Sequence, residues 1–145
     1  KDVVGTDQYI AQEAYAGKYT PLSDIFATGV IAYRLLCGRF PFHDGMFDDD
    51  PGENWVGGPK MLQIRRRLKV AQVDFSYPVF RDNPEATDLV MRMLAYNEQQ
   101  RPSAMAALEH PWLRGSDPGP GIAWEHAAVR GQQEELIDDG IIIAE

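Results

Sequence analysis

The run SDIFATGVIAYRLLCG at residues 23–38 constrains the fold most, because its pattern is helical and it is apolar on nearly every side. Ser23 is a suitable N-cap, and Gly38 marks the end of the helix. The clearly polar residues after Ser23 are Asp24, Thr28 and Arg34. A helix with so little polar surface normally lies inside a domain rather than on its outside. We therefore expect residues 23–37 to form the central helix of the fold.

Most of the remaining body also shows helical patterns. Residues 60–70 repeat apolar side chains at helical spacing, and residues 84–94 begin with a proline that suits the first turn of a helix. A short helix is expected within residues 101–113, with Ser103 as its N-cap and an end before the second proline of that stretch. Residues 73–80 are expected to be extended, because a proline there removes a hydrogen-bond donor. The sequence thus predicts a mainly α fold.

Composition divides the chain into three parts. Residues 1–113 form the body, with a loop at 43–59 that carries five acidic residues and no lysine or arginine. Residues 114–121 are rich in Gly and Pro and are expected to be a linker, followed by an acidic tail at 122–145. The acidic loop is interpreted as solvated. The basic residues at 60–69 could form ion pairs with this acidic loop within the chain, or could face a partner.

The overall composition excludes several classes of protein. A net charge of -8 argues against general nucleic-acid binding. No apolar stretch reaches the roughly 18 residues of a membrane span. The single cysteine, Cys37, excludes an internal disulfide and favours a reducing, intracellular compartment. Because the first residue is Lys rather than Met, we expect a processed chain or a fragment of a longer one.

Three motifs follow one another along the chain: GTDQYIAQE at 5–13, SDIFATGVIAYRLLCGRFPF at 23–42 and RPSAMAALEHPWL at 101–113. Together they resemble the C-terminal lobe of a serine/threonine protein kinase, most closely the calcium/calmodulin-dependent and calcium-dependent group. The resemblance covers about residues 3–113, and the loop at 43–59 is its main insertion. It implies a helical kinase C-lobe without the N-lobe, the catalytic loop and the long helix before it.

The resemblance implies structural roles for three residues. Glu13 matches the glutamate of the family's "APE" motif, and Arg101 matches the arginine that pairs with it late in the lobe. Asp24 matches the aspartate that anchors the catalytic loop, although as a carboxylate in a first helical turn it would also be stabilised by the helix dipole alone.

Further matches lie in the substrate-facing loop. Thr6 matches the threonine that contacts the catalytic aspartate and lysine, and Tyr9 and Ile10 match the wall that receives the substrate residue after the phosphorylation site. Gln12 departs from the family, which has proline there. The change is either tolerated at a turn or a sign that the loop is no longer held for peptide docking.

The parts of a kinase that bind ATP are missing from these residues. No GxGxxG, HRD or DFG motif occurs in the sequence. We therefore assign no catalytic residue and no metal ligand, and we expect ATP and magnesium to bind only if a missing N-terminal half is present. His43, His110 and Cys37 lack neighbours spaced for metal or triad chemistry, and the run around Gly140 does not fit a calcium-binding EF-hand loop.

Two hypotheses about function follow. In the first and favoured one, the chain is a structural or interaction subunit of a larger assembly and transfers no phosphate by itself. In the second, it is the substrate-binding half of an active kinase, with a peptide substrate. Both predict that a protein partner or another part of the chain covers the exposed face of helix 23–37. The residues expected on that face are Ile25, Phe26, Val30 and Tyr33.

Overall fold

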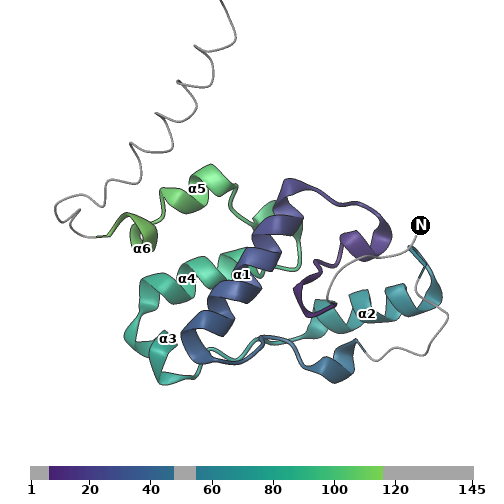
Figure 1. Ribbon diagram of the computed structural model, residues 1–145, viewed down its shortest axis with the longest axis horizontal. Helices are drawn as coiled ribbons and strands as arrows, with labels where there is room; N and C mark the ends of the chain where they lie inside the picture. Colours follow the sequence, from purple (N-terminus) through teal and green to yellow (C-terminus); the bar gives the residue numbers. More distant parts are fainter. Residues whose placement is uncertain (1–6, 48–54, 116–145) are drawn as a thin grey trace, which may run out of the picture. The chain divides into compact units, whose positions relative to one another are not determined.

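The computed structural model describes residues 7–47 and 55–115, and these contain helices and no β-strand, as the mainly α prediction requires (Figure 1). The α-helices are α1 (Pro21–Cys37), α2 (Pro59–Val70), α3 (Pro78–Asp82), α4 (Pro84–Met93), α5 (Ala104–Leu108) and α6 (Pro111–Arg114). Four 3-10 turns connect them: η1 (Asp7–Tyr9), η2 (Ala14–Ala16), η3 (Asp44–Met46) and η4 (Glu98–Gln100). No helix in the described ranges combines the length and the apolar character that crossing a membrane requires.

Several predicted segments fall outside the described residues. They are Thr6, the aspartates at 48–50, Glu53, and the linker and tail after Gly115. The chain divides into a unit of residues 1–114 and a second unit of residues 115–145.

Helix α1 begins earlier than the sequence indicated. Thr20 is its N-cap and Pro21 occupies the first helical position, where the missing N–H of proline costs nothing. Ser23 is the third helical residue, and its Oγ accepts a hydrogen bond from the Thr20 N–H at 3.1 Å while the Thr20 side chain accepts from the first turn. The prediction of Ser23 as N-cap was therefore wrong by three positions. In this capping box both the N-cap, Thr20, and the third helical residue, Ser23, carry a hydroxyl, so the sequence alone did not show which of the two is the N-cap.

Helix α4 packs directly on α1 (Figure 1), and a glycine of α1 lies at the contact. A Cβ added to Gly29 would lie 2.8 Å from the Met93 Cβ and 3.2 Å from a Leu94 methyl carbon. Only glycine allows the two backbones to approach this closely. Gly29 thus sets the distance between α1 and α4.

The four residues assigned to an external partner are instead buried within this chain. Ile25 packs with Leu89 and Met93 of α4, while Phe26, Val30 and Tyr33 belong to the larger core cluster. That prediction of an exposed face at these positions was wrong. The physical reason is that α3, α4 and the segment before α3 supply the covering surface. The Tyr33 ring stacks on Phe80 at 4.9 Å, for example, and its hydroxyl donates to the Asp74 carbonyl oxygen at 2.6 Å.

An exposed stripe does exist on α1, but on its opposite side. Ile31 is 48% exposed and Leu35 is 81% exposed. Asp24 and Thr28 are exposed on the same side, since at about 100° per residue all four fall within about 60° of one another. We call Asp24, Thr28, Ile31 and Leu35 the open stripe.

Two boundaries toward the C-terminus also differ from expectation. Pro78 starts helix α3 instead of lying in an extended segment, because its fixed φ suits a first helical position as well as a strand edge. Ser103 caps α5 as predicted, accepting a hydrogen bond from Ala106 N at 3.1 Å. Pro111 then begins the separate short helix α6.

Candidate functional site

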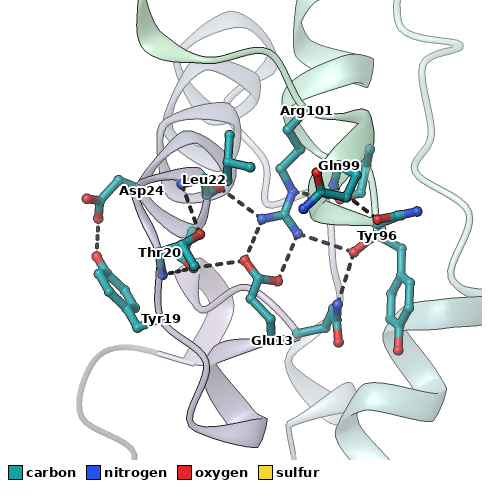
Figure 2. A network of polar contacts seen from close by, with 12 residues as sticks. Glu13, Tyr19, Thr20, Leu22, Asp24, Tyr96, Gln99 and Arg101 are labelled. Atoms are coloured by element: carbon teal, nitrogen blue, oxygen red, sulfur yellow. Dashed lines mark hydrogen bonds and ion pairs between the residues drawn. The ribbon is translucent and has the colours of Figure 1, made fainter.

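The centre of the candidate site is an ion pair between Glu13 and Arg101. The two N–H···O contacts measure 2.6 Å and 3.0 Å, so that the guanidinium binds both carboxylate oxygens (Figure 2). Both side chains are almost completely buried. The pairing that the resemblance implied is therefore present, joining residues 88 positions apart in the sequence.

Arg101 uses all of its donors. Besides the two contacts to Glu13, it donates to the backbone carbonyl oxygens of Ala95, Leu22 and Tyr96 at 2.8, 2.9 and 3.3 Å. Its guanidinium also lies 5.0 Å from the centre of the Phe26 ring. Five N–H groups and five acceptors match the hydrogen-bonding capacity of arginine, which lysine with three donors does not reach.

Glu13 is held on its other side by the start of α1. The Ser23 hydroxyl donates to Glu13 Oε1 at 2.8 Å, and Ser23 is itself fixed by the capping box with Thr20. Burial alone would raise the pKa of Glu13, but the hydrogen bonds from Arg101 and Ser23 and the charge of Arg101 outweigh it. The pKa of Glu13 therefore lies below its ordinary value, and the carboxylate stays ionised.

Gln12, the departure from the family pattern, takes part in this arrangement. It is 8% exposed, and its Oε1 accepts a hydrogen bond from Arg65 Nε of α2 at 3.0 Å. Its Nε2 donates to the Tyr96 carbonyl oxygen at 3.3 Å, the same oxygen that Arg101 contacts. Both the oxygen and the nitrogen of the side-chain amide have hydrogen-bond partners, so the geometry favours a tolerated change that ties the segment to α2.

The predicted substrate-facing residues form the outer part of the same segment. Tyr9 and Ile10 are half-buried and pack against the main core cluster. The Tyr9 hydroxyl accepts a hydrogen bond from Arg34 Nη1 at 2.9 Å, and its ring meets Phe40 edge-on at 5.4 Å. Thr6 lies outside the described residues.

Asp24 stands on the surface at the first turn of α1. Its carboxylate accepts a hydrogen bond from the Tyr19 hydroxyl (Figure 2). The role as an anchor of a catalytic loop stays a prediction, because that loop is not part of these residues. Asp24 begins the open stripe, however, and so lies on the side of α1 that the rest of the described chain leaves uncovered.

His110, Asp88 and Arg92 form a separate local group of titratable side chains. The Nδ1 atom of His110 accepts from Trp112 N at 3.2 Å, which leaves Nε2 to donate to Asp88 Oδ2 at 2.9 Å. Hydrogen bonds from Arg92 and His110 lower the pKa of Asp88. Across residues 7–47 and 55–115 no cluster of His, Cys, Asp and Glu is arranged to hold a metal ion.

Sequence reasoning missed Arg34 and Phe40, which flank Tyr9. Arg34 was noted only as a polar exception in an apolar helix, yet a single cation at such a position is a signal for a specific contact. The bonds of Gln12 to Arg65 and of Ser23 to Glu13 carried no sequence signal, because they join segments brought together only by folding.

Comparison with known proteins agrees with this arrangement. The family model described as "Protein kinase domain" matches residues 1–113. Calcium-dependent protein kinase 34 of Arabidopsis thaliana is 36% identical over 89% of this chain and 22% of its own length. Calcium-dependent protein kinase 21 of Oryza sativa subsp. japonica is 36% identical over 93% and 21%, and Calcium-dependent protein kinase 4 of Plasmodium berghei is 35% identical over 79% and 19%.

The chain thus spans about a fifth of the length of the curated relatives it matches. The matched region, the helices of the described residues and the buried pair of Glu13 with Arg101 all agree with the C-terminal lobe of a protein kinase domain. This chain belongs to the protein kinase family and provides the helical C-terminal lobe of that fold.

Proposed function

We propose that this chain is the substrate-binding part of a protein serine/threonine kinase, with ATP and magnesium bound by residues outside the sequence given. The observation that carries the proposal is the way residues 9–13 are held at both ends. Arg101 and Arg65 fix Glu13 and Gln12, and Arg34 and Phe40 fix Tyr9. A peptide-binding surface must be pre-organised in this manner, because ordering it on binding would weaken the affinity.

The open stripe supports the same proposal. Its two large apolar side chains, Ile31 and Leu35, are exposed on a helix whose other face forms part of the core. A segment carrying the catalytic groups would bury them while it approached Asp24 at the end of the same stripe. Phosphate transfer needs such groups, because nothing in residues 1–145 matches the motifs that hold the nucleotide and its metal ions.

A second candidate is a non-catalytic interaction subunit, and the open stripe also favours it. Any partner protein with a complementary apolar face could cover Ile31 and Leu35 without contributing an ATP site. The two candidates differ in what lies next to this chain in the assembled protein, and they make different predictions about nucleotide.

The test is to sequence the transcript on the 5′ side of the codon for Lys1 and to express the complete reading frame. If the first candidate is correct, the product transfers the γ-phosphate of ATP to serine- and threonine-containing peptide mixtures and is stabilised by ATP with magnesium in a thermal melt. A product that neither transfers phosphate nor responds to nucleotide would exclude the enzyme and leave the interaction subunit.

A further inference from the structure

Residues 71–77, which join α2 to α3, form an extended segment (Figure 1). The side chains alternate along it: Ala71, Val73, Phe75 and Tyr77 are half-buried and pack on the main core cluster, whereas the three residues between them are exposed. A period of two is the pattern of a β-strand with one buried face. Within the described ranges, however, this extended segment pairs with no other strand.

One edge of the extended segment carries free backbone groups. In an extended chain the N–H and C=O of one residue point to one edge, and those of the next residue point to the opposite edge. The Asp74 carbonyl oxygen accepts a hydrogen bond from the Tyr33 hydroxyl of α1, so the edge that contains Asp74 faces the lobe. Val73 and Phe75 present their backbone groups at the other edge, and none of these four groups has a hydrogen-bond partner in the part of the chain that the structure describes. An edge of this kind can accept an added strand.

A small apolar cavity lies beside the same residues. Its volume is about 60 Å³, and its walls include Ala71 and Val73 of the extended segment together with Phe42 and Leu68. Residues that lie opposite each other in paired strands point to the same face, so a residue paired with Val73 would point towards this cavity. Because a cavity of about 150 Å³ holds benzene, this smaller cavity suits a side chain such as valine better than an aromatic ring.

Unpaired cations stand at both ends of the extended segment. Lys69 is exposed in the last turn of α2, and the exposed Arg39 has its guanidinium 5.5 Å from the centre of the Tyr77 ring. Neither side chain forms an ion pair among the described residues. Between them, the exposed Asp74 carboxylate accepts a hydrogen bond from the Ser76 N–H. A partner with an acidic residue at each end and a neutral residue opposite Asp74 would match these charges, because like charges directly opposite each other repel.

We propose that the extended segment binds an extended, acidic segment of a partner protein as an added β-strand, with one small aliphatic side chain of the partner in the cavity. Hydrogen bonds to Val73 and Phe75 supply affinity, and the cavity and the two cations supply selectivity. A second copy of this chain fits less well, because self-pairing brings two Asp74 side chains onto one face and each copy carries a net charge of -8. This interaction surface is independent of phosphate transfer.

The experiment titrates the complete 145-residue chain with the peptide Glu-Val-Thr-Val-Glu, blocked at both ends, at low salt. The peptide reads the same in both directions, so it matches the cavity and the cations in a parallel or an antiparallel orientation. Amide hydrogen exchange measured by NMR should slow at Val73 and Phe75 and stay unchanged at Gln72, whose N–H points to the other edge. Absence of binding up to about 1 mM peptide, or binding that leaves exchange at Val73 and Phe75 unchanged, would overturn the proposal.

Peptide analogues separate the three contributions to binding. N-methylation of the interior amides should weaken binding about tenfold or more, because it removes the backbone donors. Alanine in place of both valines should weaken it about tenfold, and phenylalanine should also weaken it, because neither side chain fits the cavity as valine does. Glutamine in place of both glutamates should weaken it up to about fivefold, an effect that about 0.5 M salt removes.

Three results with these analogues would contradict the proposal. An N-methylated peptide that binds as tightly as its parent excludes an added strand. A phenylalanine peptide that binds more tightly excludes the cavity as the site of the side chain. Equal affinity of the glutamate and glutamine peptides at low salt excludes an acidic partner.

Matched variants place the site on the protein. Ala71→Val extends a wall residue into the cavity, and valine suits an extended backbone, so this variant should lose most of the binding while its melting temperature is kept. K69Q and R39Q should each weaken binding about twofold at low salt. K18Q makes the same charge change at an exposed lysine before α1 and should bind as the wild type does.

Two further outcomes are decisive. If Ala71→Val did not fold, hydrogen exchange and the N-methylated peptide would decide on the wild type alone. A wild-type dimer that protects the Val73 and Phe75 amides without peptide would show that a second copy occupies the edge, and would overturn the assignment to a partner protein.

Discussion

Helix α1 meets the rest of the chain in two different ways. At its N-terminal end, Ser23 and the Leu22 carbonyl oxygen join the Glu13–Arg101 pair in a closed network in which every arginine donor has an acceptor. Along the open stripe, Ile31 and Leu35 have no covering surface among the described residues. The first region is complete within the described residues, whereas the second leaves two large apolar side chains exposed.

The two regions also differ in how much stability is lost when their side chains have no partner. A buried charge without its partner is strongly destabilising, so an incomplete polar network would lower the stability of the lobe by several kcal/mol. An exposed apolar side chain merely forgoes about 1.5–3 kcal/mol that full burial would provide. The lobe can therefore fold with the open stripe exposed. Burial of the apolar side chains of the stripe against another surface would then contribute free energy to binding.

The largest expected effect comes from breaking the polar network. Arg101→Ala strands Glu13 and leaves three backbone carbonyl oxygens without this donor, and should lower the free energy of unfolding by about 3–5 kcal/mol in a urea titration. Arg101→Lys should recover only part of this loss, because lysine offers three donors in place of five. Arg92→Ala, which removes an exposed pair with Asp88, is the control and should cost under about 1 kcal/mol. Similar losses for Arg101→Ala and Arg92→Ala would show that the network does not support the lobe.

A smaller effect is expected where α1 touches α4. Gly29→Ala adds helix propensity of up to about 1 kcal/mol, but the new Cβ would lie 2.8 Å from the Met93 Cβ. Overpacking of this kind costs about 1–3 kcal/mol, and the clash should win because the atom it meets cannot rotate away. Thermal melts of Gly29→Ala and of Thr28→Ala, its exposed neighbour, would show the contrast. A stabilised Gly29→Ala protein would mean that α4 is free to shift.

These two sites show how far the sequence could be interpreted in advance. The pairing of Glu13 with Arg101 was predictable because both residues belong to motifs of the kinase pattern, and the central position of α1 followed from its apolar composition. The side of α1 that stays open was not predictable. Apolar residues surround the whole helix, so periodicity could not tell Ile25 and Val30, which α4 and the core cover, from Ile31 and Leu35, which they do not.

The contacts of polar side chains were the least predictable part of the site. Gln12 was considered as a possible loosening of the loop, yet it bonds to Arg65, 53 positions away, and that partner is chosen by the approach of α2. Arg34 likewise finds Tyr9 across 25 positions. Long side chains on surfaces select their acceptors only after packing has fixed the backbones, and no local pattern encodes the choice.

Acid should weaken the polar network specifically, and to a lesser degree than Arg101→Ala. The pKa of Glu13 is lowered in the folded protein, because the hydrogen bonds from Arg101 and Ser23 outweigh the opposing effect of burial. Its contribution is therefore fully present above the unfolded pKa of about 4.3 and is lost as the pH falls through the lower folded value. The lowered pKa of Glu13 is the difference between opposing effects. Protonating Glu13 should therefore lower the free energy of unfolding by less than Arg101→Ala does.

The measurement compares wild type with Glu13→Gln, which cannot titrate at this position. Their difference in unfolding free energy should stay constant between about pH 5 and 7 and should shrink as the pH falls below about 4.3. A difference that stays constant in acid would show that Glu13 is not the group whose ionisation stabilises the network.

The smallest effect on stability is expected at the open stripe, and it is the most direct test of the comparison. Replacing both Ile31 and Leu35 by glutamine should change the free energy of unfolding by no more than about 0.5 kcal/mol per site, because both positions are exposed and surface substitutions usually have effects of this size. The same exchange at Val30, which is fully buried one position away, should cost several times more. The double variant should also bind less hydrophobic dye than the wild type, since it removes the exposed apolar surface.

A loss of more than about 2 kcal/mol in the free energy of unfolding of the double variant would mean that residues beyond the described ranges already cover the stripe. In that case the lobe would be closed on both sides of α1, and the apolar surface proposed for a catalytic segment or a partner would already be occupied.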